Sequence, residues 1–170
     1  VGCMWSNIRK YLEGHPERLR VARLLVENGL SVKNGKIYLN EIEIPPVRVA
    51  WVAEVDRRTV KETLAAIRAN RELRLIFEGI RSAGLSLKEI AKHLNLGVVE
   101  ITPVDARIPG ILAGASMILA KSGLSIRQAI VDDPELSPEP KLTLIAEKKI
   151  PGEAIPDLLK IRGVAKVSTY

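Results

Sequence analysis

The residue pattern changes at Gly97, and this change constrains the fold more than any other feature of the 170-residue chain. Before Gly97, apolar residues recur mainly at helical spacing. After it, β-branched runs alternate with helical stretches in the order β-α-β-β-α-β. Strands joined by helices over roughly 70 residues predict one sheet with helices packed on one face. We therefore expect an α+β protein with two domains, residues 1–96 and 97–170.

The second half predicts a ferredoxin-like βαββαβ domain. Pro109 can open an apolar helix, which Ser122 and Gly123 close. Residues 132–140 hold three prolines and several acids, a composition typical of a loop. The strands are expected at 98–104, 124–131, 142–150 and 164–169, and the helices at 109–121 and 152–161.

The first half predicts helices with a short hairpin between them. Asn34-Gly35 between two β-prone runs is a strong signal for a hairpin over residues 31–39. This hairpin is compatible with the wing of a winged helix, and equally with a small strand pair that buttresses the helices. Ser86 and Glu89 have capping-box spacing, which favours a further packing helix. The expected helices cover 17–27, two segments within 47–70, 71–81 and 86–96.

The net positive charge of the chain lies entirely in its first half. The net charge is +6; residues 1–96 carry 17 Lys and Arg against 11 Asp and Glu, while residues 97–170 carry nine of each. Such asymmetry favours a polyanion partner for the first half. The alternative is a set of arginine-rich helices that are simply solvated.

Residues 49–64 resemble a helix-turn-helix of the bacterial and archaeal regulator type. Ala50 stands where the first helix needs a small residue, and Asp56 can cap the second. Glu54 occupies the turn position that most often holds glycine, so either a strained backbone or a differently shaped turn is expected there. The resemblance implies double-stranded DNA as a partner; a three-helix packing unit used for dimerisation is the alternative. The candidate DNA-binding residues are Arg57, Arg58, Thr59, Lys61 and Arg68.

Residues 97–170 resemble an ACT domain, a small regulatory module. The resemblance rests on Asp105-Ala106-Arg107-Ile108-Pro109-Gly110-Ile111-Leu112 and on the element order. The N–H groups at the start of the helix could accept a carboxylate, and Asp105 could meet a ligand ammonium group. The resemblance implies a small effector, an amino acid, and a homodimer with side-by-side sheets. The candidate effector-binding residues are Asp105, Ala106, Arg107, Ile108, Pro109, Gly110, Ile111, Ser125, Ile126 and Gln128.

Other chemistry has little support in the sequence. The chain has one cysteine and two separated histidines, which argues against a metal site, a cofactor and an enzyme. No apolar run is long enough to span a membrane, and the first residues lack a signal-peptide pattern, so a cytoplasmic protein without a membrane partner is expected. Gln128 is the only glutamine, which leans toward a thermophile.

The two halves together resemble the archaeal predicted regulators of amino-acid metabolism, which join a helix-turn-helix to an ACT domain. The resemblance implies an amino-acid-responsive transcriptional regulator. Two other functions stay open at this point. One is a regulatory subunit of an amino-acid biosynthetic enzyme, docked through the first half. The other is an ACT-like dimerisation module that senses nothing.

Overall fold

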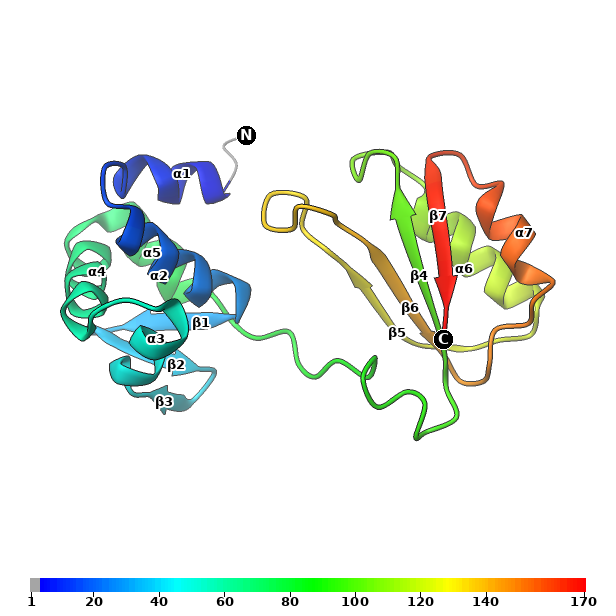
Figure 1. Cartoon of the computed structure of the whole chain (residues 1–170), viewed down its shortest axis with the longest axis horizontal. Helices are drawn as coiled ribbons and strands as arrows, with labels where there is room; N and C mark the ends of the chain where they lie inside the picture. The colour runs from blue at the N-terminus through cyan, green and yellow to red at the C-terminus, as the bar shows by residue number, and fades with distance from the viewer. Residues whose placement is uncertain (1–3) are drawn as a thin grey trace. The chain divides into compact units, whose positions relative to one another are not determined.

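The computed structural model describes residues 4–170, and the chain divides into two compact units (Figure 1). The first unit extends to Gly84 and the second spans Leu85–Tyr170. Both units combine helices with an antiparallel sheet, so the α+β prediction is confirmed. The described residues contain no helix with the length and apolarity that crossing a membrane requires.

The first unit is a cluster of helices around a small sheet. Its core is formed by buried side chains from every helix, and Phe77 is fully buried among them. The expected hairpin is confirmed: Asn34 and Gly35 have φ values of 53° and 76°, the left-handed conformations that a tight hairpin needs. The elements are α1 (Met4–Tyr11), α2 (Pro16–Glu27), β1 (Leu30–Lys33), β2 (Lys36–Leu39), β3 (Ile42–Ile44), α3 (Pro46–Ala53), α4 (Arg57–Ala69) and α5 (Arg71–Gly79).

The small sheet buttresses the helices. Its strands pair in the order β1-β2-β3, and β1 packs against α2 and α5. Val32 and Ile37 are buried, so one face of the hairpin belongs to the core of the first unit. The third strand, β3, and helix α1 are additions that the sequence pattern did not predict, because both are short.

The second unit is the ferredoxin-like domain that the sequence predicts. Its strands lie in the order β5-β6-β4-β7, every neighbouring pair is antiparallel, and α6 and α7 pack on one face (Figure 1). The core between sheet and helices holds Val99, Ile101, Ala115, Leu144 and Leu158. The elements are β4 (Gly97–Pro103), α6 (Ile111–Lys121), β5 (Ile126–Val131), β6 (Leu142–Ala146), α7 (Ala154–Leu159) and β7 (Val164–Thr169).

The helix expected over residues 86–96 was wrong. The segment forms hydrogen-bonded turns at 88–95 and packs on the sheet face opposite α6 and α7. The Ser86 hydroxyl accepts from the Lys88 N–H at 3.3 Å, an arrangement that makes a local turn instead of a capping box. Because Ala91 and Leu96 pack with Val98 and Ile145, this segment belongs to the second unit. Along the chain, the border between the two compact units therefore follows Gly84, whereas the sequence pattern placed it at residue 96.

Candidate DNA interface and effector cavity

The turn between α3 and α4 has the geometry of a helix-turn-helix. Glu54 ends α3 with φ 53° and ψ 46°, the left-handed conformation that glycine adopts most easily. The Val55 N–H donates to the Ala50 carbonyl at 3.0 Å and closes the turn. Ala50 is buried, as expected for a small residue at the contact between α3 and α4.

Helix α4 is fixed at its start and along one face. The Asp56 carboxylate accepts from the Arg58 N–H at 2.6 Å, which confirms the expected cap. Val60, Leu64 and Ile67 are buried, and they anchor the helix on the core of the first unit. The opposite face of α4 is therefore left to solvent at a defined orientation.

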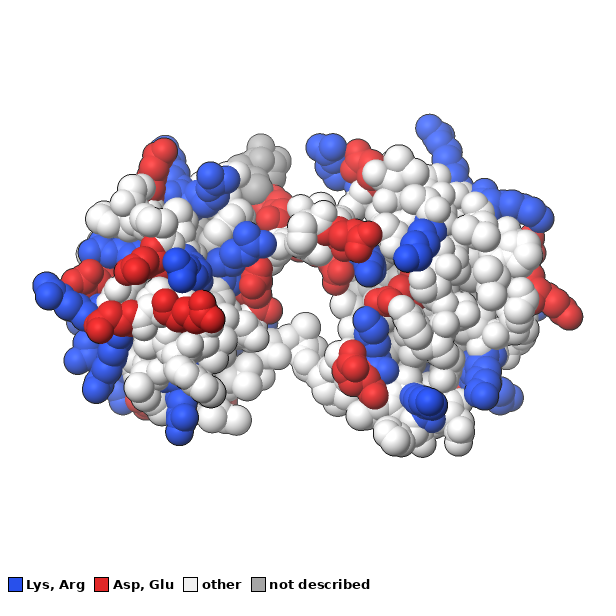
Figure 2. All heavy atoms as spheres, viewed as in Figure 1, with Lys and Arg blue, Asp and Glu red and all other residues white. Residues whose placement is uncertain are grey.

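Four of the five predicted DNA-binding side chains are exposed. Figure 2 shows Lys and Arg side chains over the α4 region of the first unit. Arg58 has a side chain that is 85% exposed. Thr59 is half-buried, and its hydroxyl donates to the Glu17 carboxylate at 3.2 Å, so it is already occupied. The exposed cations that α4 contributes are Arg57, Arg58, Lys61 and Arg68.

A carboxylate lies among these cations. Glu62 accepts from Arg18 of α2 and from Arg58, each at 3.0 Å. The hydrogen bond from Arg18, followed by that from Arg58, holds the pKa of Glu62 below its usual value. Glu62 therefore stays ionised at neutral pH and partly neutralises Arg58. Sequence reasoning missed this pair, although Arg58 and Glu62 have the i,i+4 spacing that signals it.

Replacing Glu54 with glycine should stabilise the first unit. A side chain in the left-handed region costs about 1 kcal/mol, and glycine adopts that conformation without the cost. We expect Glu54→Gly to raise the free energy of unfolding by about 1 kcal/mol in urea titrations followed by tryptophan fluorescence. Glu41→Gly is the matched control, since Glu41 lies in an exposed turn without a positive φ. Equal effects of the two variants would contradict the strain at Glu54.

The loop before α6 is closed by its own ion pair. The Asp105 carboxylate accepts from the Arg107 N–H at 2.9 Å and from two guanidinium nitrogens of Arg107, each at 3.1 Å. The side-chain hydrogen bond from Arg107 lowers the pKa of Asp105. Asp105 is thus committed to Arg107 in this structure, and the expected contact with a ligand ammonium group would have to displace the guanidinium.

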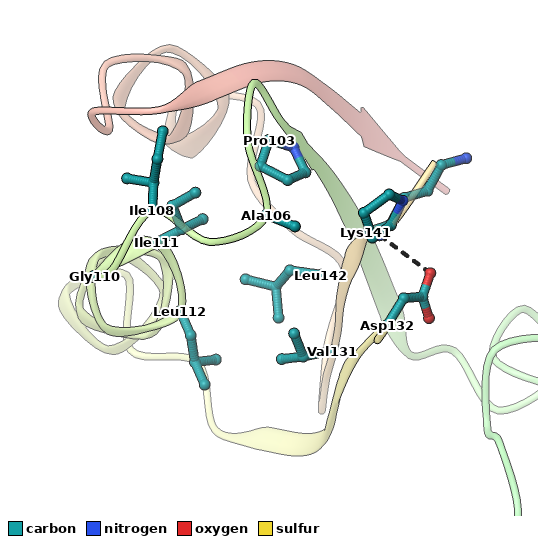
Figure 3. A pocket seen from close by; sticks show the side chains of 11 residues that line it. Pro103, Ala106, Ile108, Gly110, Ile111, Leu112, Val131, Asp132, Lys141 and Leu142 are labelled. Atoms are coloured by element: carbon teal, nitrogen blue, oxygen red, sulfur yellow. Dashed lines mark hydrogen bonds between the residues drawn. The ribbon is translucent and has the colours of Figure 1, made fainter. Parts of the chain in front are cut away.

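An apolar cavity lies beneath this loop. It has a volume of about 200 Å³ and is enclosed by the loop, the start of α6 and the adjoining ends of β5 and β6 (Figure 3). Gly110 has φ 97°, and a Cβ at that position would meet no atom within 4 Å. Four predicted effector residues line the cavity: Ala106, Ile108, Gly110 and Ile111. The other residues that line the cavity are Pro103, Leu112, Val131, Asp132, Pro140, Lys141 and Leu142.

The two charged side chains at the cavity, Asp132 and Lys141, bond to groups outside its aliphatic lining. Asp132 accepts from the Lys141 N–H at 3.1 Å, and Figure 3 shows the Lys141 amine directed away from the aliphatic side chains. The Lys141 ammonium group pairs with Glu139 at 3.4 Å. Sequence reasoning missed Val131 and Leu142. The two residues pair in register at the ends of two predicted strands. That position was the signal that could have identified them.

The remaining predicted effector residues lie outside the cavity lining. Arg107, Pro109 and Ser125 are exposed, and Ile126 packs at the edge of the core. Gln128 pairs in register with Ile145, which faces away from α6 and α7. Its side chain accepts from the Leu87 N–H at 2.8 Å and donates to the Leu85 carbonyl at 2.6 Å. Gln128 therefore holds the segment 85–96 on the sheet.

No protein-family model and no curated protein sequence matches this chain. Several solved structures are similar at low scores, and they include the three that follow. A mutant of Rv3291c is 20% identical, with a TM-score of 0.26 over 91% of this chain and 87% of that chain. The Mycobacterium tuberculosis leucine response regulatory protein LrpA is 22% identical, with a TM-score of 0.24 over 92% and 88%. AsnC of E. coli is 12% identical, with a TM-score of 0.21 over 91% and 87%. Because these scores are low, the fold assignment rests on the strand order and registers described above.

Proposed function

We propose that the protein is a transcriptional regulator that binds double-stranded DNA through α4 and responds to an amino acid bound at the cavity of the second unit. The observation that carries this proposal is the placement of α4. Its apolar face is buried, its start is capped by Asp56, and Arg57, Lys61 and Arg68 project into solvent. A recognition helix needs this arrangement, because its first residues enter the major groove and its cations contact phosphate.

The charge of the first unit supports the same partner. Residues 1–84 carry 15 Lys and Arg against 10 Asp and Glu, and residues 85–170 carry 11 against 10. The net positive first unit attracts a polyanion. The second unit is nearly neutral and does not. The ion pair of Arg58 with Glu62 makes Arg57 and Lys61 the stronger candidates for direct contact.

We expect the chain to bind duplex DNA with an affinity that falls steeply as salt increases, because each phosphate contact releases counterions. Arg57→Ala with Lys61→Ala should weaken binding roughly tenfold to a hundredfold, and the slope of log K against log salt should fall by about 2. Fluorescence anisotropy with a labelled duplex at several salt concentrations measures both quantities.

The matched control is Arg127→Ala with Arg162→Ala. It removes the same charge from exposed positions of the second unit. The control should leave duplex affinity within about twofold of the unmodified chain. Equal losses in the two double variants would mean that net charge alone drives binding. A chain without duplex affinity at low salt would contradict the DNA proposal.

We expect one or a few of the twenty amino acids to raise the melting temperature of the second unit, because a ligand bound only by the folded state stabilises it. Leu112→Glu should weaken that shift, since Leu112 lines the cavity at 42% exposure and a carboxylate there replaces aliphatic contact with the ligand. Met117→Glu is the matched control. Met117 lies on the same helix, is 59% exposed and does not line the cavity. A panel without any shift, or equal effects of the two variants, would contradict an effector at this cavity.

The proposal includes a homodimer joined along an edge of the second sheet. β5 and β7 form the two edges of that sheet, and an edge strand can pair with a second copy. Sedimentation velocity of the whole chain tests this. A monomer that still binds duplex DNA would remove the dimer from the proposal and leave the DNA contact in place.

A further inference from the structure

Residues 85–96, called the strap below, are held on the helix-free face of the second sheet by three separate contacts. Gln128 of β5 bonds to both Leu85 and Leu87 through its amide group. The Lys88 ammonium donates to the Glu100 carboxylate of β4 at 2.7 Å. Apolar residues of the strap pack on Ile145 of β6.

The carboxylate of the ion pair is buried. The Glu100 side chain is 8% exposed, and its second oxygen accepts from the Tyr170 hydroxyl at 2.9 Å. The hydrogen bond from Lys88 lowers the pKa of Glu100, and the same bond raises the pKa of Lys88. Both groups are charged at neutral pH. One of the two donors to this carboxylate, Lys88, belongs to the strap, so the ion pair exists only while the strap lies on the sheet.

The same three strands form part of the effector cavity. Pro103, Val131 and Leu142 line it, while Glu100, Gln128 and Ile145 hold the strap. On each strand the cavity residue and the strap residue are three positions apart: 100 and 103 on β4, 128 and 131 on β5, 142 and 145 on β6. A change of mobility at the strand ends around the cavity therefore acts directly on the residues that hold the strap.

The sequence of the strap favours a conformation other than the one it has on the sheet. Ser86, Glu89 and the apolar spacing of the segment favour a helix, yet on the sheet the segment forms turns. Local preference and tertiary contact thus disagree within this one segment. Such disagreement between local preference and global fold is expected at functional or strained sites.

We propose that the strap is a detachable element whose docking on the sheet is favoured by occupation of the effector cavity. The inference rests on the proposed effector function of that cavity. A ligand that orders the ends of β4, β5 and β6 lowers the further entropy cost of docking the strap, which makes the two events cooperative. Release of the strap adds up to about 40 Å of extended chain to the connection with the first unit. The cavity thereby controls how tightly the DNA-binding unit is tethered.

Hydrogen exchange of the whole chain, followed by mass spectrometry, tests the strap directly. Lys88→Met and Gln128→Met each remove one contact and should speed exchange in residues 85–96 roughly tenfold, leaving β4 and β6 unchanged. Lys92→Met, an exposed lysine of the same strap, is the control and should have no effect. Faster exchange spread evenly over the second unit would overturn the proposal, because the strap would then open only with the whole unit.

Cavity-filling variants test the link without any ligand. Ala106→Leu, or Val131→Leu if the first does not fold, occupies part of the cavity and should slow exchange in the strap about twofold or more. Ala165→Leu on β7 is the control, at an exposed position outside the cavity. Strap exchange that is the same in the filled variant and this control would overturn the link. Neither measurement involves DNA or an amino acid, so failure here is distinct from failure of the proposed function.

Discussion

Replacing Phe77 with alanine is expected to destabilise the first unit strongly and to weaken duplex binding, while the second unit stays folded. Phe77 is fully buried and lies on α5, which packs against α4 and β1. Its truncation costs about 3–5 kcal/mol in lost burial and cavity formation. A unit of this size is stabilised by roughly 5–10 kcal/mol in total, so most of that stability is lost.

The two tryptophans report on the unfolding of the first unit. Trp5 and Trp51 both lie in the first unit, so tryptophan fluorescence follows that unit alone. Calorimetry should show one transition at an unchanged temperature for the second unit and a lower one for the first. Leu75→Ala is the matched control, on the same helix but 61% exposed, and should shift stability by no more than about 0.5 kcal/mol. A single transition that moves as a whole would show that the two units do not unfold independently.

Local signals in the sequence were sufficient wherever the structure depends on local contacts. Asn34-Gly35 predicted the hairpin, and Asp56 predicted the start of α4, because turn and cap geometry involve neighbouring residues only. The order of strands and helices after Gly97 predicted the ferredoxin-like domain, since short connections leave few topologies. The left-handed turn at Glu54 followed from the helix-turn-helix resemblance, although glycine is absent there.

Sequence reasoning failed where distant residues decide the outcome. The strap has a helical pattern, yet Gln128 and Glu100 hold it as turns from strands far along the chain. The position of Gln128 on β5 did not reveal which face of the sheet its side chain occupies. One local contact was missed as well, because Arg107, two positions along the chain, turns back onto the Asp105 carboxylate. In each case a polar side chain has a partner that the spacing did not identify.

Gly97 is also constrained by backbone atoms far along the chain. Its replacement should have the largest effect on the stability of the second unit. Gly97 is buried at the start of β4, opposite Ala146 of β6. A Cβ there would lie 2.7 Å from the Ile150 backbone nitrogen and still closer to the Lys148 carbonyl oxygen. Backbone atoms of this kind cannot rotate aside, in contrast to the end of a flexible side chain.

Gly97→Ala should therefore lower the free energy of unfolding of the second unit by about 3 kcal/mol or more, beyond the usual range for an added methyl group. Gly152→Ala is the matched control: Gly152 has no positive φ, and a Cβ there meets nothing within 4 Å, so this variant should be neutral or slightly stabilising. Calorimetry gives the two stabilities, and tryptophan fluorescence should show an unchanged first unit. Because the strap ends at the residue before Gly97, the displaced strand should also loosen the strap, visible as faster exchange in residues 85–96. A Gly97→Ala chain as stable as the Gly152→Ala chain would mean that residues 148–150 can move away from β4 at little cost.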